Sequence, residues 1–241
     1  MTAPGRVTLV LLPGLDGTSV FFRPLLAALP SWVEPLVIEY PSDGGDDYPH
    51  LLALVSEAVR GLDAYWVLGW SFSGPLALML AARDPDRVRG VILCASFVRA
   101  PRPALAWCRF MVVGPVFWIV RVARRVPSFL LRTRRRGTWH DKAETWTRVS
   151  AATLARRIRA LLAIDARDEL HRCQATVVYL ASSRDVLVPR RNADDIVRQK
   201  PSTSVVVIDG PHMALYTSPL AAAEAICRVL GAITRRTMID C

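Results

Sequence analysis

The sequence predicts an α/β fold with a mostly parallel, doubly wound sheet and an inserted helical lid in the middle of the chain. Two observations predict the sheet: short, nearly continuous apolar runs recur along the chain, and segments with helical spacing lie between them. Strands that are covered by helices on both faces need continuous apolar runs, so a parallel sheet is favoured over an antiparallel one. The alternation of strand and helix implies right-handed crossovers.

Six apolar runs fit buried strands, and five segments between or after them fit amphipathic helices. The expected strands are Val7–Leu12, Leu36–Tyr40, Trp66–Gly69, Val91–Cys94, Thr176–Ala181 and Ser204–Ile208. The expected helices are Val20–Leu29, Tyr48–Leu62, Phe72–Arg83, Arg191–Gln199 and Pro219–Ile233. Ligands of such sheets bind at the carboxyl ends of the strands, which is where functional residues are to be sought.

The alternation is interrupted once, over residues 97–172, where no strand-like run occurs and several prolines separate short helical stretches. We therefore expect an α/β core formed by residues 1–96 and 173–241, and a helical lid formed by residues 97–172. Ala104–Ala123 is as long as a membrane span, but it contains Arg109 and Arg121 and is broken at Gly114-Pro115. A lid packed on the sheet is the better interpretation of this stretch.

Composition limits the possible class of protein. The chain has 241 residues, of which 52% are hydrophobic, and this is enough for one large core in a single domain. Five cysteines form no pair with regular spacing, and the N-terminal apolar run is too short for a secretion signal, so we expect a reduced, cytoplasmic protein. The histidines and cysteines show no metal-ligand spacing, and we expect no metal or organic cofactor.

A serine-centred turn, Gly69-Trp70-Ser71-Phe72-Ser73-Gly74, joins an expected strand to an expected helix. A nucleophile elbow is such a turn, and its strained backbone leaves room only for small side chains two residues on either side of the nucleophile. Gly69 and Ser73 satisfy this rule around Ser71, although glycine is usual where Ser73 stands. Ser73 is the rival nucleophile, but Pro75 suits a helical first turn better than an elbow. An ordinary turn with two capping serines is the simpler alternative.

Two further strand ends carry the partners that a serine nucleophile needs. A neutral imidazole must take the hydroxyl proton, and a carboxylate must orient that imidazole. Asp185 follows the strand Thr176–Ala181, and His212 follows the last strand, in the order Ser, Asp, His that this kind of sheet requires. Asp209 is the closest rival acid, but it lies too near His212 in sequence and fits a turn former better. The sequence thus predicts a triad of Ser71, Asp185 and His212.

An oxyanion formed at Ser71 needs hydrogen-bond donors. The backbone N–H of Phe72 follows the nucleophile, and the loop after the first strand should supply the second donor. This loop, Leu12-Pro13-Gly14-Leu15-Asp16-Gly17-Thr18, bends at Gly14, which makes the Leu15 N–H the natural choice. The loop also fits a glycine-rich turn in which Asp16 or Thr18 caps the next helix, and the two interpretations are compatible. It lacks the Gly-Lys-Ser/Thr signature of a phosphate-binding loop.

Four segments together resemble a bacterial family of the α/β-hydrolase fold that begins with a Pro-Gly-Leu-Asp-Gly-Thr loop. They are Leu11–Thr18, Gly69–Leu76, Ser96–Val98 and Gly210–His212. The resemblance covers most of the chain and implies the triad, the oxyanion hole and the lid named above. It implies no substrate, because the fold hosts many reactions. Through Gly-Trp-Ser, the chain is more loosely similar to carboxylesterases that release pimeloyl methyl esters from a carrier protein.

The expected lid is both aromatic and basic. Phe110, Phe117 and Trp118, together with Trp70 beside the nucleophile, either line an acyl pocket or simply pack on the sheet. The chain has a net charge of +10, and the basic excess lies between Arg99 and Arg159. This surface could attract an acyl carrier protein or an anionic membrane, or it could be a solvated face without a partner. No recognition motif accompanies the charge, so nucleic acid is not expected as a partner.

We therefore expect hydrolysis of a small carboxylic ester or thioester with an apolar acyl group through an acyl-enzyme on Ser71. The first alternative is an acyltransferase that uses the same triad and passes the acyl group to an alcohol or amine. The second is a hydrolase-like binding protein without activity. The sequence leaves the natural substrate and the oligomeric state open.

Overall fold

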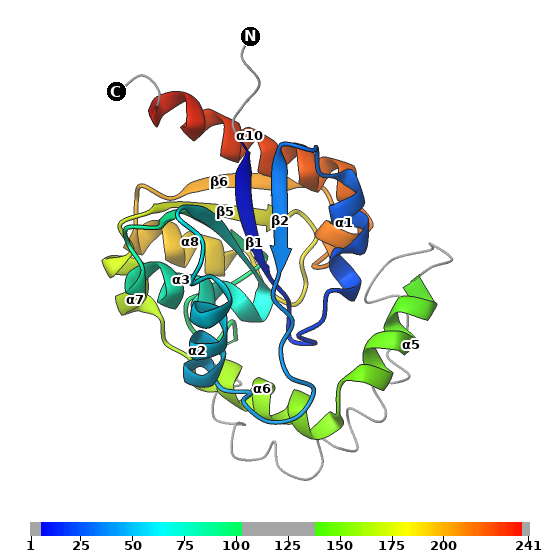
Figure 1. Cartoon of the computed structure of the whole chain (residues 1–241). Coiled ribbons are helices and arrows are strands. Elements are labelled where there is room, and N and C mark those ends of the chain that lie inside the picture. Colours follow the sequence, from blue (N-terminus) through cyan, green and yellow to red (C-terminus); the bar gives the residue numbers. More distant parts are fainter. Residues whose placement is uncertain (1–5, 103–137, 238–241) are drawn as a thin grey trace.

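The computed structural model describes residues 6–102 and 138–237, and within them the chain forms one six-stranded sheet between two layers of helices (Figure 1). All neighbouring strands are parallel, in the order β2-β1-β3-β4-β5-β6. The strands are β1 (Val7–Leu12), β2 (Val33–Val37), β3 (Tyr65–Trp70), β4 (Val88–Cys94), β5 (Thr176–Ser182) and β6 (Ser204–Ile208). The predicted doubly wound α/β fold is confirmed.

Helices from different parts of the chain cover the two faces of the sheet (Figure 1). One face carries η1 (Val20–Phe22), α1 (Arg23–Ala28), α9 (Ala214–Thr217) and α10 (Pro219–Thr237). The other face carries α2 (Tyr48–Ala58), α3 (Gly74–Arg83), α7 (Arg167–Arg172) and α8 (Arg191–Gln199). The short 3-10 helix η2 (Ser71–Ser73) lies between β3 and α3.

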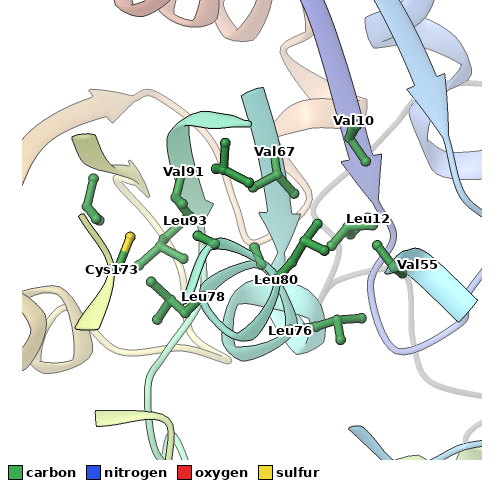
Figure 2. Packing of buried hydrophobic residues seen from close by; sticks show 14 of the residues in the cluster. Val10, Leu12, Val55, Val67, Leu76, Leu78, Leu80, Val91, Leu93 and Cys173 are labelled. Atoms are coloured by element: carbon green, nitrogen blue, oxygen red, sulfur yellow. The ribbon is translucent and has the colours of Figure 1, made fainter. Parts of the chain in front are cut away.

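Residues along a single strand alternate between two hydrophobic clusters, one on each face of the sheet. In β1, Val10 and Leu12 pack beneath α2 and α3, whereas Leu9 and Leu11 pack on the opposite side. Figure 2 shows the first cluster, in which side chains of β1, β3 and β4 face those of α3. Successive side chains of a strand point to opposite faces, and burial of a Leu or Val side chain contributes about 1.5–3 kcal/mol. The continuous apolar runs therefore reflect burial on both faces.

The second strand lies three residues earlier than the sequence pattern indicates. β2 spans Val33–Val37, whereas the expected run was Leu36–Tyr40. Pro35 and the exposed Glu34 hid its start, because a proline argues against a central strand. β2 pairs only with β1 and forms an edge of the sheet, where a strand tolerates proline since one side of its backbone needs no ladder hydrogen bond.

Within the segment predicted to be a lid, the described residues 138–172 form three helices, α5 (Thr138–Arg148), α6 (Ala151–Ala163) and α7. Helices α5 and α6 lie beyond the carboxyl ends of β1 and β2 (Figure 1). On α5, Glu144 accepts two hydrogen bonds of 2.6 Å from Arg23, and Arg148 pairs with Glu39 at 2.8 Å. Helix α7 packs instead against the core helices α3 and α8. The division into core and lid stays a prediction.

No helix in the described part of the chain is long and apolar enough to span a membrane. The stretch Ala104–Ala123 lies outside the described residues, so its interpretation as part of a lid stays a prediction.

Candidate active site

The serine turn has the backbone geometry of a nucleophile elbow. Strand β3 ends at Trp70, and Ser71 then adopts a φ of +51°, in the left-handed region that side chains other than glycine rarely occupy. Helix α3 begins three residues later at Gly74. A positive φ at a non-glycine residue is costly and persists only where the surroundings enforce it, so the local structure holds Ser71 in this conformation.

Three small residues around Ser71 make this sharp turn possible. A Cβ atom at Gly69 would lie 2.4 Å from the carbonyl oxygen of Ser73, and one at Gly74 would lie 1.9 Å from the hydroxyl of Ser96. Ser96, two residues after the end of β4, donates a 2.5 Å hydrogen bond to the carbonyl oxygen of Ser71. Gly69 therefore lets the elbow fold back closely on its own backbone, and Gly74 lets it pack directly on the segment that follows β4.

Ser71, His212 and Asp185 form a continuous chain of hydrogen bonds at the carboxyl edge of the sheet. The Nε2 atom of His212 lies 2.9 Å from the Ser71 hydroxyl, and its Nδ1 atom lies 2.7 Å from Oδ2 of Asp185. The other carboxylate oxygen, Oδ1, accepts from the backbone N–H groups of Leu187 at 2.8 Å and Val188 at 2.9 Å. The side chains of Asp185 and His212 are 6% and 11% exposed, so little water competes for these bonds.

Asp209, the rival acid, has different partners. Its carboxylate accepts hydrogen bonds from the hydroxyl of Ser183 and from Arg184, and its side chain is 75% exposed. The hydrogen bond from the Ser183 hydroxyl and, to a smaller extent, the contact with Arg184 hold the pKa of Asp209 below its usual value. Asp209 thus links the loops that follow β5 and β6.

Ser73, the rival nucleophile, is fully buried and already engaged. Its hydroxyl donates to the carbonyl oxygen of Pro13 and lies 2.5 Å from the Tyr40 hydroxyl. Because the one Ser73 proton goes to Pro13, the Tyr40 hydroxyl must donate to Ser73. Burial raises the pKa of Tyr40, which remains a neutral phenol. The serine that replaces the usual glycine of the elbow therefore ties the elbow to the loop after β1.

The loop after β1, which was expected to supply an oxyanion donor, forms a tight turn beside the elbow. The N–H of Gly17 donates to the carbonyl oxygen of Gly14 at 3.0 Å, and Gly17 has a φ of +72°. The Asp16 carboxylate accepts from both the N–H and the hydroxyl of Thr18, and burial nonetheless raises the pKa of Asp16. Among the described residues, no acceptor is found for the N–H of Leu15. Phe72 is fully buried, and Tyr48 donates to its carbonyl oxygen at 2.8 Å.

Aromatic side chains pack beside the triad. Trp70 is 2% exposed, and its ring lies 6.4 Å from that of His212 and 5.6 Å from that of Phe22. Phe21 contacts the edges of both Trp70 and Tyr216. Trp70 is thus close to the nucleophile but largely covered by its neighbours. The other expected pocket residues, Phe110, Phe117 and Trp118, lie outside the described residues, and so do the arginines between positions 121 and 136.

The match to a known family agrees with this geometry. A sequence model described as the alpha/beta hydrolase family matches residues 9–225. The chain belongs to the alpha/beta hydrolase family. The matched range includes β2 to β6 in full, β1 from Leu9 onward, the elbow and the loops that carry Asp185 and His212.

Relatives that resemble the chain span nearly the same length. RutD of Caulobacter sp. (strain K31), named as a carbamate hydrolase, is 25% identical over 95% of this chain and 92% of its own length. A pimeloyl-[acyl-carrier protein] methyl ester esterase of Xanthomonas campestris pv. campestris (strain B100) is 28% identical over 93% of this chain and 95% of its own length. The crystal structure of a hydrolase from Pseudomonas aeruginosa PA01 superposes with a TM-score of 0.79 at 18% identity, covering 94% of this chain and 90% of that one. Family and relatives together indicate a hydrolytic enzyme.

Sequence reasoning missed two buried polar residues, Tyr40 and Arg157, that contact the elbow or the loop after β1 in this candidate site. Tyr40 lies at the end of an apolar run and looked like part of a strand, and Arg157 was one of many arginines in the predicted lid. One signal did exist for Arg157: it follows Leu154 by one helical turn and so shares the buried face of α6. An arginine on a buried helix face needs polar partners elsewhere in the fold, and these partners are distant in sequence.

Proposed function

We propose that this alpha/beta hydrolase is a serine hydrolase that cleaves a carboxylic ester or thioester with an apolar acyl group. The proposal rests above all on one observation, the continuous hydrogen-bond chain from the Ser71 hydroxyl through His212 to Asp185. A serine hydroxyl is a weak nucleophile until an oriented base takes its proton, and this chain supplies such a base.

Acylation begins with proton transfer from the Ser71 hydroxyl to Nε2 of His212. With the Nδ1 proton donated to Asp185, the lone pair of Nε2 faces the serine at 2.9 Å. As the proton moves, the Ser71 oxygen attacks the acyl carbon, and the carbonyl oxygen takes the negative charge. Asp185 stabilises the imidazolium that forms, and its own position is fixed by the Leu187 and Val188 N–H groups.

The N–H groups of Leu15 and Phe72 are the proposed donors to the oxyanion. Support comes from the position of Phe72 directly after the nucleophile and from the absence of any acceptor for the Leu15 N–H in the described part of the chain. When the tetrahedral intermediate collapses, His212 returns its proton to the leaving alcohol or thiol. Water then attacks the acyl-enzyme with His212 as base, and the carboxylic acid leaves.

An ester or thioester with an apolar acyl group is the proposed substrate class for two reasons. Trp70 packs beside His212, and Phe21 packs against both Trp70 and Tyr216, so the described surroundings of His212 are largely aromatic and apolar. Relatives that match at least 90% of the chain are named as esterases of a carrier-bound methyl ester. Binding of an acyl carrier protein or an anionic membrane by the arginine-rich lid stays a prediction, because those arginines lie outside the described residues.

Labelling with a fluorophosphonate, which phosphonylates activated serines, tests this proposal. Wild-type protein should gain one label that peptide mapping assigns to Ser71, and Ser71→Ala should gain none. Ser73→Ala, the matched control for the rival nucleophile, should still be labelled at Ser71. Hydrolysis of 4-nitrophenyl butyrate without any added alcohol or amine then separates a hydrolase from an acyltransferase. Absence of label in folded wild-type protein would overturn the proposal.

A further inference from the structure

Arg157 is the largest fully buried side chain in the described part of the chain. It lies on α6, within the segment predicted to be a lid, and its side chain is 0% exposed. A buried guanidinium is expensive unless nearly all of its N–H groups meet acceptors, since desolvation of an ion costs several kcal/mol. Its contacts therefore indicate what the fold gains by placing a charge there.

The contacts of Arg157 converge on the loop after β1. Its Nη1 atom donates to the carbonyl oxygens of Leu15, at 3.1 Å, and Asp16, at 2.8 Å. The Nη2 atom donates to the carbonyl oxygen of Pro41 at 2.7 Å, and Nε lies 3.2 Å from the buried carboxylate of Asp46. The three carbonyl oxygens that accept from Arg157 and the carboxylate that pairs with it belong to two loops of the core, more than 100 positions away in sequence.

With these bonds, each carbonyl oxygen of the turn after β1, from Pro13 to Gly17, accepts a hydrogen bond. The oxygen of Pro13 accepts from Ser73, and that of Gly14 accepts from the N–H of Gly17. The oxygens of Leu15 and Asp16 accept from Arg157, and the oxygen of Gly17 accepts from the N–H of Tyr40 at 2.8 Å. No peptide plane of the turn can rotate without breaking one of these bonds.

The direction of the Leu15 N–H follows from these constraints. A trans peptide is planar, so its N–H points opposite to the carbonyl of the preceding residue, here Gly14. Because the oxygen of Gly14 faces the N–H of Gly17 inside the turn, the N–H of Leu15 points away from the turn. Arg157 holds the next two peptides, after Leu15 and after Asp16, and thereby prevents the turn from opening on that side.

We propose that Arg157 is a positioning residue that holds the Leu15 N–H in place as an oxyanion donor, so that a helix of the insertion completes the catalytic centre. This role rests on the proposed function, since it presupposes an oxyanion at Ser71. Arg157 touches neither Ser71 nor His212 among the contacts described, and it acts through the backbone of the loop.

The space that holds the Arg157 side chain between the two loops is shaped for a guanidinium. Arginine presents five N–H donors in a rigid planar fork, whereas lysine offers one compact ammonium that cannot reach three carbonyls and a carboxylate together. The guanidinium also lies over the Tyr40 ring, 5.5 Å from its centroid. A Cβ atom at Gly17 would lie 2.4 Å from Nη1, so glycine at this position leaves room for the guanidinium.

The test compares Arg157→Lys with Arg156→Met. Arg156 is the matched control because it is the next residue on α6 and also pairs with Asp46, at 2.6 Å, but it contacts no carbonyl of the turn. Three quantities are measured: kcat and KM for 4-nitrophenyl butyrate, and the affinity for an alkyl trifluoromethyl ketone. The ketone adds the Ser71 oxygen to its carbonyl carbon, and the resulting oxyanion reports on the oxyanion donors.

For Arg157→Lys we expect kcat to fall about 100-fold, as for loss of one oxyanion donor, while KM changes less than about threefold. Ketone affinity should fall by the same factor as kcat/KM. Arg156→Met should keep all three quantities within about twofold of wild type, since it leaves the turn intact. If Arg157→Lys does not fold by circular dichroism, the double variant Asp46→Asn/Arg157→Met, which leaves no unpaired buried charge, is measured instead.

Two outcomes would overturn the role. One is a folded Arg157 variant whose kcat stays within threefold of wild type. The other is a loss of kcat without a parallel loss of ketone affinity, which would place the effect outside the oxyanion hole. Failure of the proposed function itself is recognised separately: wild-type protein would then neither hydrolyse the ester nor bind the ketone, and this role would fall with it.

Discussion

The substitution Asp185→Asn should trap His212 in the wrong tautomer. Oδ1 of Asp185 accepts from two backbone N–H groups, those of Leu187 and Val188, while Oδ2 faces Nδ1 of His212. An asparagine has one oxygen and one NH₂ group. Its oxygen must face the two N–H donors, because an NH₂ group there would leave three donors facing each other. The NH₂ group is then directed at His212.

In that arrangement Nδ1 must accept a hydrogen bond, so the proton of the neutral imidazole moves to Nε2. An Nε2–H cannot take the proton of Ser71, and nucleophilic attack stops in most molecules. The expected loss in kcat is about 10⁴-fold, the size seen when a triad carboxylate becomes an amide, or about 5.5 kcal/mol in the barrier. Binding is unaffected in this scheme, so KM should change little.

The assay is hydrolysis of 4-nitrophenyl butyrate, with folding checked by circular dichroism. Asp209→Asn is the control, because Asp209 lies in the His212 loop but bonds Ser183 and Arg184 instead of the imidazole. The control should retain kcat within about threefold. A loss of less than tenfold in folded Asp185→Asn would refute the reasoning, because it would show that His212 works without a carboxylate at Nδ1.

Three further substitutions probe the scaffold. Ser73→Ala should lower the free energy of unfolding, measured in urea, by about 1–3 kcal/mol, because Pro13 and Tyr40 lose a buried partner. Tyr40→Phe should lower it less, because the bond from Ser73 to Pro13 remains. Asp47 caps α2, because its carboxylate accepts a hydrogen bond from the backbone N–H of His50, and this bond lowers the pKa of Asp47. The stabilisation by the cap is therefore present above about pH 4 and is lost as the pH falls through the lowered pKa. We expect Asp47→Ala to lower the free energy of unfolding by about 1 kcal/mol at pH 7. If wild type and this variant lost stability below pH 4 in the same way, the result would contradict the cap.

The sheet was predictable because burial on both faces leaves an unmistakable sequence pattern. Val7–Leu12 and Thr176–Ser182 are nearly continuous apolar runs, and both are strands at close to the expected positions. The edge strand β2 was misplaced because an edge relaxes the pattern: Glu34 and Pro35 are exposed there. Sequence reasoning therefore works best where the environment is most constrained and loses register where one side of a strand faces solvent.

The chemical groups of the site were predictable for a related reason. Ser71, Asp185 and His212 each follow a strand, and parallel strands bring their carboxyl ends to one edge, so topology alone makes such residues neighbours. No such rule applies to Arg157. Its contacts depend on how α6 lies over two core loops, and local sequence carries no information about that packing.

The serine at position 73 shows how the elbow and the oxyanion loop depend on each other. A glycine there would satisfy the steric rule of the elbow equally well, yet it would leave the carbonyl of Pro13 and the hydroxyl of Tyr40 without their shared partner. With serine, the residue that follows Phe72 is bonded directly to the residue that precedes Gly14. The distance between the two proposed oxyanion donors is then set by one side chain on the elbow side and by Arg157 on the lid side. Such fixed donors stabilise charge without reorganising during the reaction, which is where most electrostatic catalysis originates.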